Sequence, residues 1–126
     1  MDMMNLGVTA LLLIASPAAT QSPPYRWLTS GELDSVLRGS RIIEADARES
    51  YMRTPELFHQ NGSYARYSDN YEVHGKYSFR NDAVCDQAVG EPEVCRKILV
   101  DQAGRYWIVG RENPRLLVRI DVKPIR

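Results

Sequence analysis

Hydrophobic and polar residues alternate most regularly between Tyr71 and Arg80, where every second residue is apolar or glycine. The apolar series is Tyr71, Val73, Gly75, Tyr77 and Phe79. A second series closer to the C-terminus is Leu116, Val118, Ile120 and Val122. A period of two is typical of a strand that buries one face and exposes the other to water. Both stretches are therefore predicted to be half-buried strands.

One short helix is indicated by the sequence Thr29-Ser30-Gly31-Glu32. Thr29 as the N-cap and Glu32 three residues later form a capping box, in which each side chain accepts a hydrogen bond from the other residue's backbone N–H. An apolar stripe begins at Leu33, and Gly39 suits the left-handed conformation that ends many helices. We expect the helix to run from about Ser30 to Arg38.

A hairpin from Glu56 to Tyr67 is predicted around Asn61-Gly62, because this dipeptide readily adopts the positive φ angles of tight turns. A three-residue loop, Gln60-Asn61-Gly62, with a glycine bulge would place Phe58 opposite Tyr64. We prefer this register because it pairs two aromatic side chains.

Shorter apolar runs separated by turn residues complete the pattern. They cover residues 41–46, 83–86, 95–100 and 105–109, whereas the stretch from Ala47 to Pro55 is polar and poorly patterned. The total is about eight strands in meander order. Because an open sheet of this size would expose its edges, the predicted fold is mainly β. It is an antiparallel small barrel or strongly curled sheet, with the short N-terminal helix plugging one end or packing on an edge.

The first 20 residues have the layout of a secretory signal peptide. An apolar run from Leu6 to Ala15 is followed by small residues and a proline. The run falls well short of the roughly 20 residues that span a bilayer. Cleavage after Ala18 and cleavage after Thr20 both fit the small-residue rule. We predict a signal peptide over residues 1–20 and a periplasmic or secreted protein without a stable membrane span after cleavage.

One feature of this segment departs from the usual pattern. No Lys or Arg precedes the apolar run, and Asp2 partly cancels the charge of the α-amino group. An uncleaved interfacial anchor and a buried N-terminal helix therefore stay open as alternatives.

Residues 21–126 are predicted to form a single domain, which is long enough for one modest core. This part of the chain carries 16 basic and 15 acidic residues. A nucleic-acid partner normally requires clustered basic residues, so the balance argues against one.

Cys85 and Cys95 are the only cysteines, and in an exported chain such a pair predicts a disulfide. The alternatives are a metal pair and a redox dithiol, but the spacing matches neither a zinc site nor a C-x-x-C motif. Closing a loop of about 11 residues would stabilise the fold by roughly 2.8 kcal/mol in the chain-entropy model.

Candidate catalytic groups are few. Of the two histidines, we expect His59 on a hairpin face and His74 on the wet face of a strand. The cysteines are expected to be oxidised and no G-x-S-x-G motif is present, so a hydrolase nucleophile is not indicated. The carboxylates Glu44, Asp46 and Glu49 form either a solvated strand end or an acid–base or cation site. The sequence predicts no enzyme, no metal and no cofactor.

The aromatic residues are the better indication of function. Phe58, Tyr64, Tyr77 and Phe79 are predicted to face one interior, together with one of Tyr106 and Trp107. Eight-stranded barrels either fill with side chains or hold one small ligand. The four named residues are therefore the candidate ligand-binding residues, and a filled core is the alternative.

Several short motifs occur in the order Leu37-Arg38-Gly39, Phe58-x3-Gly62-x-Tyr64, Gly75-x-Tyr77, Cys85, Cys95 and Gly104-x-Tyr106. With the preceding signal segment, this order resembles small exported bacterial β-barrel proteins of lipocalin-like build, most of them of unknown function. The resemblance spans most of the chain after residue 20. It implies a barrel, and it carries over no functional residue.

Two classes of function are favoured. The first is a non-catalytic binding module that holds a small apolar ligand inside the barrel. The second is a module that binds an envelope protein or inhibits an enzyme through exposed loops near residues 47–55 and 88–93. An enzyme is the third interpretation. A ligand binder predicts an internal cavity, whereas an inhibitor predicts a packed interior and a rigid, protruding loop.

Overall fold

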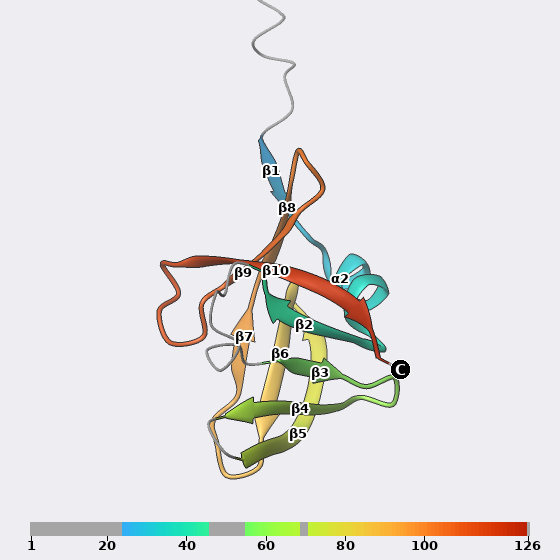
Figure 1. Ribbon diagram of the computed structural model, residues 1–126, viewed down its shortest axis with the longest axis vertical. Coiled ribbons are helices and arrows are strands. Elements are labelled where there is room, and N and C mark those ends of the chain that lie inside the picture. The colour runs from blue at the N-terminus through green and yellow to red at the C-terminus, as the bar shows by residue number, and fades with distance from the viewer. Residues whose placement is uncertain (1–23, 46–54, 69–70, 126) are drawn as a thin grey trace, which may run out of the picture.

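The computed structural model describes residues 24–45, 55–68 and 71–125 (Figure 1). The predictions for the signal peptide and for most of the loop at residues 47–55 lie outside these ranges. The described chain contains one helix, α2 (Ser30–Leu37). The strands are β1 (Tyr25–Trp27), β2 (Ser40–Glu44), β3 (Glu56–Phe58), β4 (Ser63–Ser68), β5 (Tyr71–Arg80), β6 (Ala83–Ala88), β7 (Val94–Arg96), β8 (Ile98–Asp101), β9 (Tyr106–Val109) and β10 (Leu117–Pro124).

All neighbouring strands of the sheet are antiparallel, in the order β1-β8-β9-β10-β2-β3-β4-β5-β6-β7. Lys97 alone separates β7 from β8. The first half of this segment pairs with β6 and the second half with β9, and Val109 N donates a hydrogen bond to Lys97 O at 3.1 Å. The sheet therefore curls so that one continuous segment, residues 94–101, joins the strand β6 to the strand β9.

The fold prediction is confirmed: the protein is mainly β, with a curled antiparallel sheet and one short helix. Ten strands are described instead of about eight. One of the additional strands is β1, in a stretch for which the sequence predicted no strand, and the other arises because Lys97 divides the strand predicted at residues 95–100.

Helix α2 begins and ends where the sequence predicts. Thr29 Oγ1 accepts from Glu32 N at 3.2 Å, and Glu32 Oε1 accepts from Thr29 N at 3.0 Å, which is a complete capping box. Gly39 follows the helix with φ of 79°. Ser30 and Asp82 exchange two hydrogen bonds, which fasten the start of the helix to the β5–β6 turn. In the part of the chain that the structure describes, no helix is long and apolar enough to cross a membrane.

The β3–β4 hairpin has the expected register, with Phe58 opposite Tyr64. The alternation along β5 also holds, since Val73 and Tyr77 are buried between exposed neighbours, although Tyr71 at the start of the strand is exposed. Helix α2 contributes Leu33 to the core that these strands form. Helix α2 therefore covers part of the apolar core.

Candidate functional site: a pocket with a buried charge cluster

A pocket of about 580 Å³ opens at the end of the sheet away from helix α2. Strand β2 starts at Ser40, directly after the helix, and ends at Glu44, which lines the pocket. Strand β10 runs the other way, from Leu117 beside the pocket to Pro124 opposite Ser40. In Figure 1 the loop between β9 and β10, which contributes to the pocket, lies on the opposite side from α2.

One side of the pocket is an apolar wall built by β2, β9, β10 and the loop before β10. The side chains of this wall that point to the interior are Ile42, Ile108, Leu116, Val118 and Ile120. The loop is short and internally bonded, because Gly110 N donates to Leu116 O at 2.9 Å and Leu116 N donates to Asn113 O at 3.0 Å. A side chain at Gly110 would meet Asn113 O at 2.6 Å, so only glycine fits this turn. The turn fixes the neighbouring residue, Arg111.

The other side of the pocket leads to a charge cluster of four ionised residues and one phenol. Glu56 Oε1 accepts from Arg111 Nη2 at 2.9 Å, and Glu56 Oε2 accepts from Arg96 Nη1 at 3.0 Å. Asp86 accepts from Arg96 Nη2 at 3.1 Å and from Arg111 Nη1 at 2.9 Å. Tyr64 donates its hydroxyl proton to Glu56 Oε1 at 2.6 Å. Two carboxylates and two guanidinium groups therefore alternate, and their charges cancel.

This cluster is deeply buried. The side chain of Asp86 is 1 % exposed and that of Arg96 is 4 % exposed. Burial alone would raise the pKa of Glu56, but Arg96, Arg111 and the Tyr64 hydroxyl together lower it to about 2. Burial and the charge of Glu56 raise the pKa of Tyr64 far above the ordinary value of a phenol. At neutral pH Glu56 is thus ionised and Tyr64 is protonated.

A further ion pair extends from the cluster to the surface. Arg66 lines the pocket, and its Nη2 donates to Glu91 Oε1 at 2.7 Å. Glu91 belongs to the β6–β7 loop, and its side chain is 42 % exposed. Arg66 therefore connects the pocket to that loop.

The four predicted ligand-binding residues come together, but away from this pocket. The ring centroids are 5.4 Å apart for Phe58 and Tyr64, 5.2 Å for Phe58 and Tyr77, and 5.4 Å for Tyr77 and Phe79. They pack on one another in the apolar core, to which the helix residue Leu37 also belongs. Of the described residues that line the pocket, none is one of these four. Only the Tyr64 hydroxyl reaches the charge cluster.

The residues of the charge cluster were not singled out by the sequence, although a signal for them exists. Glu56 lies two residues before Phe58, and Asp86 lies two residues after Val84, a position fully buried in the core. Arg96 lies directly opposite Val84 in the β6–β7 ladder. Residues two apart on a strand point to the same face. Once the neighbouring apolar residues are assigned to the inner face, these charged side chains must therefore lie there too.

The other candidate groups lie apart from the cluster. His74 is exposed, with its Nε2 3.5 Å from Glu72 Oε1, and the backbone carbonyl of His59 accepts from the Tyr77 hydroxyl. Glu44 is exposed at the edge of the pocket. Its predicted partners Asp46 and Glu49 lie outside the described residues.

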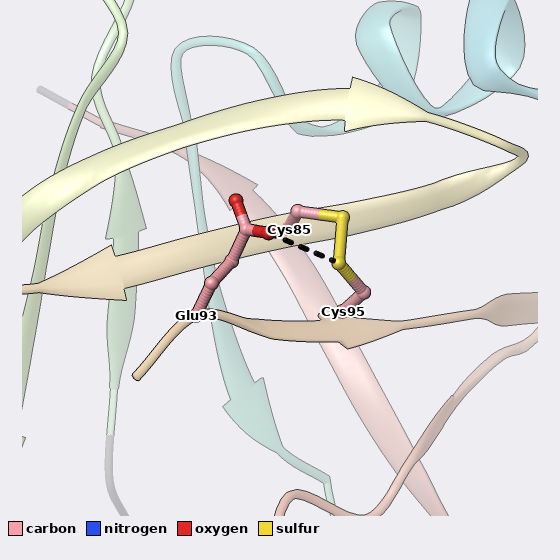
Figure 2. Close-up of side chains that lie close together, drawn as sticks. All are labelled: Cys85, Glu93 and Cys95. Carbon is pink, nitrogen blue, oxygen red and sulfur yellow. Dashed lines mark hydrogen bonds between the residues drawn. A yellow bond between two sulfur atoms is a disulfide. The ribbon is translucent and has the colours of Figure 1, made fainter. Parts of the chain in front are cut away.

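Cys85 and Cys95 form the predicted disulfide between directly opposite residues of β6 and β7. Glu93 lies beside them, within 4.8 Å of both sulfur atoms (Figure 2). The disulfide uses the two thiolates that a metal would require, and Glu93 is paired with Arg80. The group is therefore structural. A partly buried disulfide of this kind indicates an oxidising environment of extracellular type.

A second hollow, of about 450 Å³, lies between α2 and strands β8 and β9. Its charged groups are Arg26 and Glu32, which pair with each other at 2.8 Å. Glu32 also accepts a hydrogen bond in the capping box. Both charged groups therefore already have partners within the protein, and this hollow is a weaker candidate site.

Known proteins give no further guide to the pocket. Comparisons with family models, with curated proteins and with solved structures each found no match.

Proposed function

We propose that this protein is a non-catalytic, exported binding module that holds a small molecule with an apolar body in the pocket between the apolar wall and the charge cluster. The observation that carries the proposal is the combination, in one pocket, of apolar side chains with a few convergent polar groups. Its volume of about 580 Å³ falls in the ordinary range for small-molecule sites, roughly 300–1,000 Å³.

The chemistry of the charge cluster supports binding more than catalysis. A general base at neutral pH needs a pKa near 7, whereas the pKa of Glu56 is about 2. Asp86 is held by two guanidinium groups, and the raised pKa of Tyr64 keeps it from acting as a phenolate nucleophile. Groups fixed in this way are suited to orienting a ligand.

Export is part of the proposal. The signal-like segment over residues 1–20 and the disulfide both point to the same kind of compartment. We place the protein in the periplasm or outside the cell, where it would meet its ligand after cleavage of the segment.

Binding of a neutral probe tests this function. Decanol should bind, as measured by isothermal titration calorimetry, and native mass spectrometry of protein from an oxidising host should detect a small-molecule adduct that is lost on denaturation. Leu116→Asp puts a charge into the apolar wall and should weaken decanol binding by about tenfold or more, since burying an apolar side chain contributes about 1.5–3 kcal/mol.

Leu117→Asp is the matched control, because Leu117 is exposed like its neighbour Leu116 but does not line the pocket. Decanol should bind this variant as it binds the wild type. A folded wild type that binds no decanol and carries no adduct would refute the proposed function.

A second function, protein binding or enzyme inhibition through the loop at residues 88–93, is favoured by one observation. Val89 is 84 % exposed at the tip of this loop, yet the loop is held firmly. Val89 N donates to His74 O at 2.8 Å, and Glu91 N donates to Ala88 O at 3.0 Å. A rigid loop with an exposed apolar tip suits insertion into a partner. Val89→Asp should then abolish capture of an envelope protein without changing decanol binding.

A further inference from the structure

Two arginine side chains that line the pocket each carry a buried nitrogen that lacks a hydrogen-bond partner among the residues the structure describes. These atoms are Nη1 of Arg66 and Nε of Arg96. Buried polar groups are almost always paired, because an unpaired buried donor is costly. Both atoms are donors. The arginines that line the pocket therefore keep donor capacity close to it, although these two nitrogen atoms are themselves covered by protein.

Arg66 is the more accessible of the two. Its side chain is 12 % exposed, and the partner of its Nη2, Glu91, is 42 % exposed. An ion pair with one exposed member contributes little, because water competes for the carboxylate. Another carboxylate that enters the pocket can therefore replace Glu91 on Nη2 at small cost.

Arg111 adds a second positive charge at the same place. It also lines the pocket, its side chain is 21 % exposed, and its charge acts electrostatically on Arg66. An anion between two guanidinium groups is stabilised by both, and the planar guanidinium fork matches the two oxygens of a carboxylate.

We propose that the ligand is an amphiphilic carboxylate, whose head accepts hydrogen bonds from Arg66 and Arg111 and whose apolar chain lies along Leu116, Val118 and Ile120 of the apolar wall. This inference rests on the proposed function and names the ligand class of the same pocket. On binding, the ligand head takes the place of the Glu91 carboxylate on Arg66.

Two exposed acidic residues at the edge of the pocket determine the orientation of the ligand. Glu44 and Glu112 both line the pocket, and both are exposed. They disfavour a carboxylate at the edge, although water and salt weaken this repulsion. The head is therefore directed inward, toward the arginines, and the chain toward the apolar wall.

The test compares three probes of equal chain length on the full processed protein by isothermal titration calorimetry: decanoate, decanol and decyltrimethylammonium. Decanoate should bind about tenfold or more tightly than decanol, in keeping with a charge-assisted hydrogen bond. The cationic probe should bind most weakly. Raising the salt concentration should reduce the advantage of decanoate over decanol.

Two variants assign the effect to the proposed residues. Arg66→Gln should remove the advantage of decanoate and leave decanol binding unchanged. Glu91→Gln removes the competing carboxylate and should strengthen decanoate binding severalfold. Arg80→Gln is the matched control, because Arg80 makes an equivalent pair with Glu93 outside the pocket. It should bind every probe as the wild type does.

The outcomes separate the two proposals. If decanol binds and decanoate binds no better, or if Arg66→Gln weakens both probes equally, the carboxylate inference is wrong and the binding function stands. Tightest binding of the cationic probe would likewise overturn it. If no probe binds the folded protein, the proposed function itself fails. If Arg66→Gln does not fold, the binding of the three probes to the wild type and to Glu91→Gln still tests the carboxylate inference.

Discussion

Removal of the Arg96 guanidinium tests the charge cluster most directly. The side chain of Arg96 is 4 % exposed and donates to both Glu56 and Asp86. In Arg96→Met the two carboxylates keep Arg111 as their one hydrogen-bonded guanidinium, so one buried negative charge loses its partner. Breaking a buried pair costs about 3–5 kcal/mol. That is a large fraction of the roughly 5–15 kcal/mol by which domains are stable.

Urea unfolding at pH 7, followed by tryptophan fluorescence, measures this cost. The matched control is Arg80→Met, because the Arg80–Glu93 pair is exposed on both sides. Its loss should change the free energy of unfolding by about 0–1 kcal/mol. The difference between the two variants isolates the effect of burial on an otherwise similar ion pair.

A pH dependence distinguishes a stranded charge from simple loss of packing. Arg96 supplies the largest effect that opposes burial at Glu56, so in Arg96→Met the pKa of Glu56 should rise above its usual value. A carboxyl with a raised folded-state pKa takes up a proton on folding as the pH falls, which stabilises the folded state. The deficit of Arg96→Met should therefore shrink between pH 7 and pH 5. A cost below about 1 kcal/mol, or a deficit that is equal at both pH values, would refute the reasoning.

Three other predictions concern stability and use the same urea assay. The folded-state pKa of Glu56, about 2, lies below its usual 4.5. The ionised carboxylate therefore stabilises the fold by about 3 kcal/mol at most, above pH 4.5, and this stabilisation is lost as the pH falls toward 2. Glu56→Gln should flatten the dependence of the free energy of unfolding on pH in this range. Replacing Cys85 and Cys95 with Ala should cost about 3 kcal/mol; a cost near zero would contradict a structural disulfide. In Gly75→Ala the new methyl would lie 1.9 Å from Gln87 O, so we expect a loss of about 1–3 kcal/mol, and an unchanged urea midpoint would show that β5 and β6 are not so close.

Local signals in the sequence predicted the elements well, because each of them depends on neighbours along the chain. The capping box at Thr29 and the Asn61-Gly62 turn are short-range patterns, and both appear as expected. The break at Lys97 was not predicted. It arises from the need of one segment to pair with β6 on one side and β9 on the other, and this depends on the closure of the whole sheet.

The inward side of β9 could not be decided from alternation, because Ile108 and Val109 support opposite answers. In the structure Tyr106 packs against the core, as does the buried Ile108. Trp107 lies on the other face, where its Nε1 donates to Asp101 Oδ2 at 2.9 Å. The orientation thus depends on a hydrogen-bond partner at the end of the neighbouring strand β8.

The charge cluster could not be predicted for a different reason. A charged residue in an alternating strand is normally assigned to the wet face, so Glu56 and Asp86 were not considered as interior residues. Glu56 lies on β3, and its partner Arg96 lies 40 residues further along the chain, on β7. Only the curled sheet brings the two strands' inner faces together, and no spacing in the sequence encodes that pairing.

The net stability that the charge cluster contributes does not explain why charged residues occupy this position. Buried ion pairs contribute little net stability, because the cost of desolvation offsets their attraction, and apolar side chains of similar volume often serve equally well. At these positions, however, apolar side chains would continue the core from Tyr64 into the pocket. Charged side chains instead end the core there and place guanidinium groups in the lining of the pocket. We therefore expect the stability and the ligand preference of this protein to depend on different members of one network. Arg96 should govern unfolding, whereas Arg66, at the exposed edge, should govern which ligand head is accepted.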